Sequence, residues 1–348
     1  MKSLTEIKDP VFQGNHLSSL DEFFLKYIRD ERDLPFIYLS LKITFTVIPL
    51  GIILYTNLLT GWAWWAVAIL DLLLVSLYFL GPYTLMLHNT SHRKFFKSDY
   101  YYLNKYIPWV IGPFMGQSPE SYFSHHIGMH HPENNLKADK SCTMFYQRDS
   151  FIDFMKYYLR FMLIGFFELY EYLTTTNKSV MRRNLIKGEM TWYLSAILLS
   201  LWNWQATLFV FILPFIVVRF GMMAGNWAQH AFIDRKDPAN CYTNSITCIN
   251  SVYNKRCFND GYHIGHHFHP AMHWTDMPGN FLKNKDKYAD NQAVVFEKLD
   301  YFMVWLYLMM GKYKWLADHF VNINNRYETD DQVIALMRER TRKISPAA

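Results

Sequence analysis

Two long apolar runs lie close together in the first quarter of the chain. Residues 36–59 read FIYLSLKITFTVIPLGIILYTNLL, and residues 62–87 read WAWWAVAILDLLLVSLYFLGPYTLML. Each exceeds the roughly 20 residues that a helix needs to cross the hydrocarbon core of a bilayer. The short link between them permits only a tight turn, where Trp62, Trp64 and Trp65 cluster as aromatic residues do at a membrane interface. The pattern predicts a first transmembrane hairpin.

A third apolar run, residues 190–225, is too long for one crossing, because as a single helix it would extend about 54 Å. Tryptophans recur at its middle, in the sequence WNWQ. We therefore expect a second hairpin, with spans at about 186–203 and 206–226. Two hairpins return residues 88–189 and 226–348 to the side of the N-terminus. The two outer turns hold no Lys or Arg, so the positive-inside rule makes that common face cytosolic.

Two further apolar segments are interrupted by charge or are short. Residues 151–173 carry Asp, Lys, Arg and Glu along their length, which is typical of a helix lying in the membrane interface. Residues 301–316 are too short to cross and are expected to pack similarly. The predicted fold class is all-α: an integral membrane protein with a stalk of four transmembrane helices and a cytosolic helical cap. The chain divides into a cytosolic segment (1–35), this membrane domain with its cap (36–316) and a cytosolic tail (317–348).

Charge and composition narrow the class of protein. The net charge is +5, yet no stretch interleaves Lys and Arg with stacking aromatic residues, so nucleic acid is not an expected partner. The mean hydropathy of −0.07 is low for a wholly embedded chain, which indicates a large extramembrane part. The four cysteines form no CxxC pair and no zinc spacing, which fits unpaired thiols on a reducing, cytosolic side.

Twelve of the fourteen histidines fall in four clusters, and all four clusters lie on the predicted cytosolic face. The clusters read HNTSH, HHIGMHH, NWAQH and HIGHHFHPAMH. Each contains a pair of residues spaced i, i+4, which places the two side chains on one face of a helix. The pairs are His88/His92, His126/His130, Asn226/His230 and His263/His267.

This set of histidines predicts a metal site. Imidazole is a preferred ligand of iron, zinc and copper. Nine histidines are too many for one ion with about four to six ligand positions, and they suit two ions. Cys ligands are absent and carboxylates are few in the clusters, which argues against structural zinc. The Glu and Glu-x-x-His pattern of soluble di-iron bundles is missing as well.

The order HxxxH, HxxxHH, NxxxH and HxxHH around two hairpins resembles the membrane fatty acid desaturase and hydroxylase superfamily, over about residues 30–285. The resemblance implies a cytosolic cap holding two irons, with O₂ as co-substrate for attack on an unactivated C–H bond of a fatty acid or fatty acyl chain. Electrons are expected from a separate ferredoxin, rubredoxin or small cytochrome with its reductase, because no fused redox domain is visible. Asn226 is implied to act through a water, and the implied metal ligands are His88, His92, His126, His130, His131, His230, His263, His266 and His267.

The motifs leave alternatives open. Many acyl desaturases have HxxHH where this chain has HxxxHH, and that spacing together with NxxxH is similar to alkane hydroxylases, which usually have six spans. His125 directly precedes the second motif and is an alternative ligand, although the i, i+4 spacing favours His126. We expect a desaturase; the alternatives are hydroxylation, decarboxylation of a fatty acid to a terminal alkene and, remotely, a metal transporter or sensor. The protein is expected to be multi-pass, in a bacterial inner membrane or the endoplasmic reticulum.

Three other polar residues stand out. Asp71 lies in the middle of a predicted span, where an ionisable residue is a functional candidate by default. The alternative is a hydrogen bond to a Ser or Thr of the first span, such as Ser40. His269 and His273 fall outside the matched spacing, and we expect them to support the ligands or to make structural hydrogen bonds.

Overall fold

The computed structural model describes residues 1–14 and 17–344. Residues 15–16 of the predicted N-terminal segment and residues 345–348 of the predicted tail lie outside the described part. The chain forms two compact units. Unit 1 comprises Met1–Phe12, Met129–Glu171 and Met222–Ala348, and unit 2 comprises Gln13–Gly128 and Tyr172–Gly221. Both are predominantly helical, in agreement with the predicted class.

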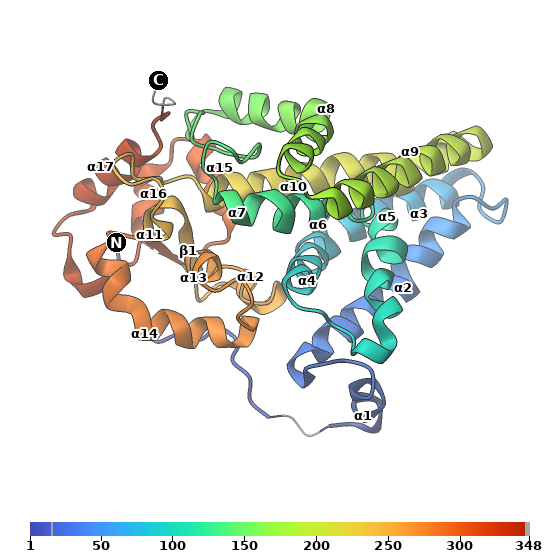
Figure 1. Cartoon of the computed structure of the whole chain (residues 1–348), viewed down its shortest axis with the longest axis horizontal. Coiled ribbons are helices and arrows are strands. Elements are labelled where there is room, and N and C mark those ends of the chain that lie inside the picture. Colours follow the sequence, from blue (N-terminus) through green and yellow to red (C-terminus); the bar gives the residue numbers. More distant parts are fainter. Residues whose placement is uncertain (15–16, 345–348) are drawn as a thin grey trace. The chain divides into compact units, whose positions relative to one another are not determined.

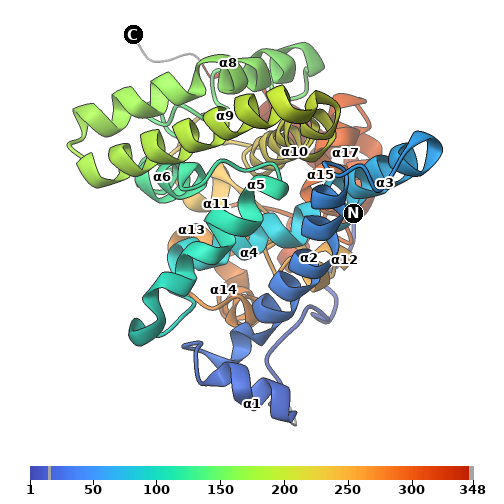
Figure 2. The same ribbon diagram turned by 90° about the vertical axis from the view of Figure 1, so that its right-hand side faces the viewer.

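The first two apolar runs form neighbouring helices in unit 2. Their elements are α1 (Ser19–Leu25), α2 (Leu34–Ile53), α3 (Gly61–Leu73), a π-helical segment η2 (Leu74–Phe79) and α4 (Leu80–His92). Helices α2 and α3 lie side by side in both views (Figures 1 and 2). Trp64 of α3 stabilises the turn between them, because its indole Nε1 donates a hydrogen bond to the carbonyl of Leu54 at 3.0 Å.

The first helix ends at Ile53 and not at residue 59, as the apolar run predicted. The amides of Tyr55 and Thr56 donate three residues back, to the carbonyls of Ile52 and Ile53, at 3.0 Å each. Bonds of this kind tighten the last turn and end the helix, even though the apolar run continues to Leu58 and Leu59. The second helix, in contrast, continues past the predicted end at residue 87, as far as His92.

The third apolar run folds back on itself. It comprises α9 (Ser179–Thr207), a π-helical segment η6 (Leu208–Ile212) and α10 (Leu213–Gln229), with non-helical backbone at Asn203 (φ −148°, ψ 93°). The Trp192 ring stacks on the Phe215 ring with centroids 4.2 Å apart, although a straight helix would separate these residues by about 34 Å. Asn203 begins the second arm, because its Oδ1 accepts from the amide of Ala206 at 3.0 Å. The reversal coincides with the predicted WNWQ turn.

Three helices of the described chain are long and apolar enough to cross a membrane. The third has 51 residues, about the length of two crossings. The remaining elements of unit 2 are short: η3 (Ser98–Lys105), η4 (Ile107–Ile111), α5 (Gly112–Phe114) and α6 (Ser121–His125). The three candidate spans are Glu31–Ile53, Gly61–His92 and Ser179–Gln229.

Unit 1 is built from shorter helices and includes the long α8 (Phe151–Thr175), which begins where the interfacial helix was predicted. The predicted helix 301–316 is two helices, because Gly311 adopts a left-handed conformation (φ 65°) that interrupts it. The π-helical η5 (His126–His130) begins in unit 2 and ends in unit 1. The other helices of unit 1 are α7 (His131–Glu133), α11 (Cys241–Asn244), α12 (Val252–Arg256), α13 (His263–Phe268), η7 (Trp274–Asp276), α14 (Met277–Asp290), α15 (Tyr301–Met309), α16 (Tyr313–His319), η8 (Ile323–Asn325) and α17 (Asp330–Arg340).

A two-stranded parallel sheet in unit 1 makes the all-α prediction wrong in detail. Strand β1 (Ile246–Ile249) pairs with β2 (Val294–Glu297), and every residue of both strands is buried. Strands of four uniformly buried residues show no alternation that could reveal them in the sequence. The connection between them carries α12, α13 and α14 (Figure 1). Ile264 of α13 joins the core under the sheet, so the sheet holds this histidine-bearing helix in place.

The close approach of α9 to Pro119 generates a prediction about stability. A Cβ atom on Gly188 would lie 1.7 Å from the carbonyl oxygen of Pro119. We expect Gly188→Ala to destabilise the protein by about 1–3 kcal/mol or more, as overpacking does. The measurement is the melting temperature of the detergent-solubilised protein. The matched control is Gly279→Ala in α14, where a Cβ meets nothing within 4 Å; equal melting temperatures for the two variants would contradict the packing at Gly188.

Candidate metal centre

Four histidines of unit 1 converge on one point, and we call them the tetrad: His130, His230, His263 and His267. One ring nitrogen of each lies within 4.8 Å of those of the others. His263 Nε2 is 3.4 Å from His230 Nε2 and 2.9 Å from His267 Nε2. His130 is buried at the end of η5, and His230 directly follows α10. His263 and His267 lie one turn apart on α13, as their spacing predicted.

The outer nitrogens of two tetrad rings are held by hydrogen bonds. His130 Nδ1 lies 2.7 Å from Asp139 Oδ2. His230 Nδ1 lies 2.9 Å from the carbonyl oxygen of Asn244 and 3.0 Å from its Oδ1. Carboxylate, carbonyl and amide oxygens only accept, so Nδ1 of each ring carries the proton and donates it. The Nε2 atoms of His130 and His230 therefore keep their lone pairs.

The tetrad fits a transition-metal ion. Imidazole nitrogens bound at about 2.0–2.1 Å lie about 3.0 Å apart at right angles and about 3.4 Å apart in a tetrahedron. The measured Nε2 separations, 2.9 and 3.4 Å, fall in this range. Burial and, to a smaller extent, the neighbouring His130 lower the pKa of His230 to about 4. His230 is therefore a neutral imidazole at pH 7, which is the form that binds metals.

The other predicted ligands form two smaller groups. In unit 2, His88 and His92 lie one turn apart on α4, and the Nε2 of His92 is 3.0 Å from that of His126. We call these three the trio. In unit 1, His131 Nε2 is 2.9 Å from His266 Nε2, and we call these two the pair. The separations in both groups match those in the tetrad.

The tetrad, the trio and the pair contain all nine histidines implied by the resemblance, but not in the expected pairing. His126 belongs to the trio and His130 to the tetrad, so the expected pair is divided. Residues 126–130 form a π-helix, whose wider turn does not stack residues four apart as an α-helix does. Among the described residues, His125 belongs to none of these three groups.

Asn226 lies on α10, one turn before His230. Its Nδ2 donates to the hydroxyl oxygen of Tyr157 at 2.7 Å and to the carbonyl of Ser141 at 3.3 Å. Both N–H groups of the amide are thus used in these hydrogen bonds, which leaves Oδ1 as the atom that a water could contact. Its action through a water stays a prediction.

Asp71 and the two outlying histidines have definite surroundings. Asp71 is 1% exposed, and neither carboxylate oxygen has a hydrogen-bond partner among residues 1–14 and 17–344. The alternative role, a hydrogen bond to a Ser or Thr of the first span, is wrong, because the hydroxyls of Ser40, Thr44 and Thr46 contact the Met86 sulfur, the Ser40 carbonyl and the Lys42 carbonyl instead. His273 makes a structural contact, with Nδ1 2.8 Å from the hydroxyl of Thr275, and His269 is exposed.

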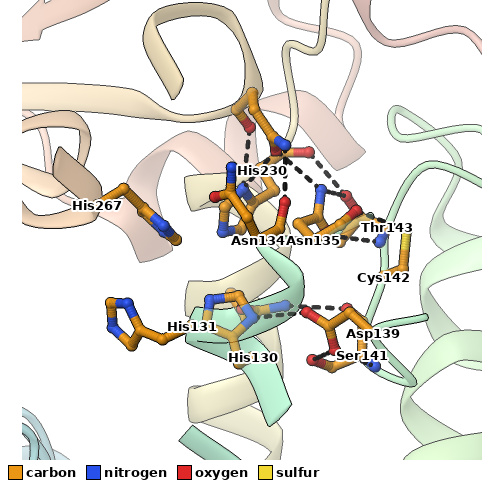
Figure 3. A network of polar contacts seen from close by, with 12 residues as sticks. His130, His131, Asn134, Asn135, Asp139, Ser141, Cys142, Thr143, His230 and His267 are labelled. Atoms are coloured by element: carbon orange, nitrogen blue, oxygen red, sulfur yellow. Dashed lines mark hydrogen bonds and ion pairs between the residues drawn. The ribbon is translucent and has the colours of Figure 1, made fainter. Parts of the chain in front are cut away.

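The residues that sequence reasoning missed are Asp139 and Asn244. Both belong to a network of polar contacts around His130 and His230, which Figure 3 shows. Asp139 follows His130 at a distance that matches no motif, and Asn244 ends the short helix α11, which follows α10. The sequence signal that could have revealed Asp139 is its position shortly after a histidine cluster, in a region with few carboxylates.

Comparisons with known proteins bear on this site. The family model described as "Fatty acid desaturase" matches residues 62–298, which include the tetrad, the trio and the pair. Neither the curated proteins nor the solved structures gave a match.

If the tetrad holds a metal ion, loss of one of its histidines should lower the metal content of the protein. His263 faces two other tetrad nitrogens, so His263→Ala should lower the bound metal by about one equivalent per chain. Elemental analysis of the purified full-length protein measures this. The matched control is His269→Ala at the end of the same helix, which should keep the wild-type content. Equal metal content in the two variants would argue against a metal at the tetrad.

Proposed function

The chain belongs to the fatty acid desaturase family, and from this premise we propose that it is a membrane-bound, O₂-dependent oxidoreductase that desaturates fatty acyl chains at a di-iron centre. The observation that carries the proposal is the tetrad. One ring nitrogen of each of four buried or half-buried imidazoles lies within 4.8 Å of the others. In His130 and His230, a hydrogen bond from Nδ1 leaves the lone pair on Nε2. A cation is the partner that such a set of lone pairs requires.

The proposed membrane arrangement has four spans in two hairpins. The helix α2 is the first span, and the continuous helix from α3 to α4 is the second. The two arms of Ser179–Gln229 are the third and fourth, which the stacking of Trp192 on Phe215 supports. The histidine-bearing segments then share the cytosolic face, because both outer turns lack Lys and Arg.

We place one iron at the tetrad, and the five histidines of the trio and the pair are the remaining ligands that the resemblance implies for the second. Chain continuity supports this division, because His126 of the trio and His131 of the pair lie at the two ends of one short helical stretch. Four and five imidazoles also suit the usual coordination numbers of two ions. The irons would supply the activation of O₂ that removal of hydrogen from an unactivated C–H bond requires.

The protein's own residues orient the ligands and exclude water. Asp139 and Asn244 hold the protons on the outer nitrogens of His130 and His230, so that both rings present Nε2 to the centre. His230 is fully buried, which keeps bulk water from that side of the site. The spans α4 and α10 end at ligands, so an alkyl chain entering from the bilayer core along them would reach the site. The electrons would come from a separate redox protein.

Hydroxylation is the second candidate, and one observation favours it. The second motif reads HxxxHH and the third reads NxxxH, a combination similar to alkane hydroxylases. Both reactions begin by breaking a C–H bond at the same centre. The four proposed spans, against the six usual in those hydroxylases, favour desaturation.

Isotopically labelled fatty acids fed to cells that express the full chain test the reaction. We expect products lighter by two hydrogens in mass spectrometry, and products that are only alcohols would favour the hydroxylase.

His131→Ala should lower the amount of product by more than the roughly 10–100-fold that loss of a ligand's supporting residue causes. The control is His319→Ala, whose Nδ1 lies 2.9 Å from the Trp315 carbonyl, away from the three groups. About one zinc and no iron per wild-type chain would overturn the proposal.

A further inference from the structure

We propose that the segment from Asn134 to Thr143 orients two ligands of the tetrad, and that Asp139 within it is the positioning residue that gives the tetrad its negative charge and its metal affinity. This inference rests on the proposed function, because it takes the tetrad to hold one of two metal ions. Figure 3 shows residues of the segment beside His130 and His230, with the Asp139 carboxylate joined to the His130 ring.

Asp139 is fixed in the direction of His130. The side chains of Asp139 and His130 are 0% and 3% exposed, and Asp139 Oδ2 lies 2.7 Å from His130 Nδ1. The other carboxylate oxygen, Oδ1, accepts from the amide of Ser141 at 2.8 Å and from its hydroxyl at 2.6 Å. Because one oxygen is tied to its own loop, the other cannot swing away from the imidazole.

The segment reaches His230 through two asparagines. Asn135 Nδ2 donates to Asn244 Oδ1 at 3.1 Å, and Asn244 contacts His230 Nδ1. Asn244 is itself held from the segment, because its Nδ2 donates to the carbonyl of Asn134 at 2.8 Å. The hydroxyl of Thr143 donates to the backbone carbonyl of His230 at 2.8 Å. The same segment therefore fixes both the ring and the backbone of this ligand.

The backbone explains why asparagine occupies the start of the segment. Asn134 and Asn135 both adopt left-handed conformations, with φ of 49° and 56°. Asparagine tolerates this region far better than most residues, and two in succession reverse the chain directly after α7. The reversal returns the segment toward the histidines of η5 and α10, from which its side chains hydrogen-bond.

The carboxylate has a second effect, which is electrostatic. Neutral imidazoles bring no charge to a divalent ion, so burial of the ion at the tetrad leaves its charge uncompensated. Asp139 places a negative charge one imidazole ring away from the ion. A carboxylate on the outer nitrogen also makes a histidine a more basic ligand, and loss of such a partner typically lowers metal affinity by about 10–100-fold.

Matched substitutions separate the charge from the orientation. Asp139→Asn keeps an oxygen that accepts from His130 Nδ1 and removes the charge, whereas Asp139→Ala removes both. Ser141→Ala is the control, because it deletes one hydrogen bond to Asp139 and leaves the contact with His130. The probe is Co²⁺, titrated into the metal-free full-length protein in detergent against a competing chelator. The absorbance of bound cobalt and the rise in melting temperature on cobalt addition are the readouts.

We expect two cobalt ions in the wild type. Asp139→Asn should weaken one of them by about 10–100-fold, Asp139→Ala at least as much, and Ser141→Ala by no more than a few-fold. In a His263→Ala background, which lacks the tetrad ion, Asp139→Asn should not weaken the remaining ion further. A purely structural Asp139 would instead lower the melting temperature equally with and without cobalt, and that result would overturn the inference.

The outcomes distinguish this inference from the proposed function. Wild-type protein that binds fewer than two cobalt ions overturns both. Two wild-type ions with unchanged affinities in Asp139→Asn overturn only the role of Asp139. If the Asp139 variants do not fold, Asn244→Ala decides. It removes the Oδ1 contact to His230 Nδ1 and the side-chain hydrogen bonds to Asn134 and Asn135, leaves the backbone carbonyl contact, and should weaken the same single ion. Two unchanged ions would then overturn the role of the segment.

Discussion

The convergence of imidazole lone pairs at the tetrad is the constraint on which unit 1 depends. Lone pairs within 4.8 Å of each other repel, and the burial of three of the four rings removes the water that would otherwise satisfy them. The fold must hold the rings in place until a cation binds. The four histidines come from separate parts of the chain, so binding of the proposed metal would be thermodynamically coupled to the folding of unit 1.

The scaffold meets this constraint by anchoring the tetrad histidines to packed elements. The parallel pairing of β1 with β2 fixes both ends of the connection that carries α13. Ile264, between the ligands His263 and His266, packs with Phe281 and Val295 in the core. His230 is placed by the end of α10, and the Trp227 indole of that helix donates to the carbonyl of Arg148 at 2.9 Å. The ligand positions therefore follow from ordinary core packing.

Residue spacing correctly predicted those features that depend on local helix geometry alone. The i, i+4 rule correctly joined His88 with His92 and His263 with His267, because these segments are α-helical. The apolar pattern also placed the reversal at WNWQ, where Asn203 leaves helical geometry. The rule did not hold for His126 and His130, because the π-helical turn there is not encoded in residue spacing.

Long-range contacts could not be predicted in this way. Asn244 reaches His230 only after the chain has turned back from α10, and the pairing of Ile246 with Val294 spans the whole α12–α14 connection. Asp139 is closer in sequence to its partner, yet its role depends on two left-handed residues that redirect the backbone. The sequence thus supplied the histidines that the resemblance implies as ligands, whereas the residues that hydrogen-bond to them emerge from tertiary structure.

The electrostatics of unit 1 show why neutral ligands suffice at the tetrad. The chain carries a net charge of +5, which by itself disfavours a bound cation. The local field is different, because α10 ends at Gln229, next to His230, and a helix C-terminus carries about half a negative charge. The buried carboxylate of Asp139 adds to it from the side of His130. For the proposed metal, the attraction would thus come from the surrounding protein, and the imidazoles would set the geometry and the preference for a transition metal.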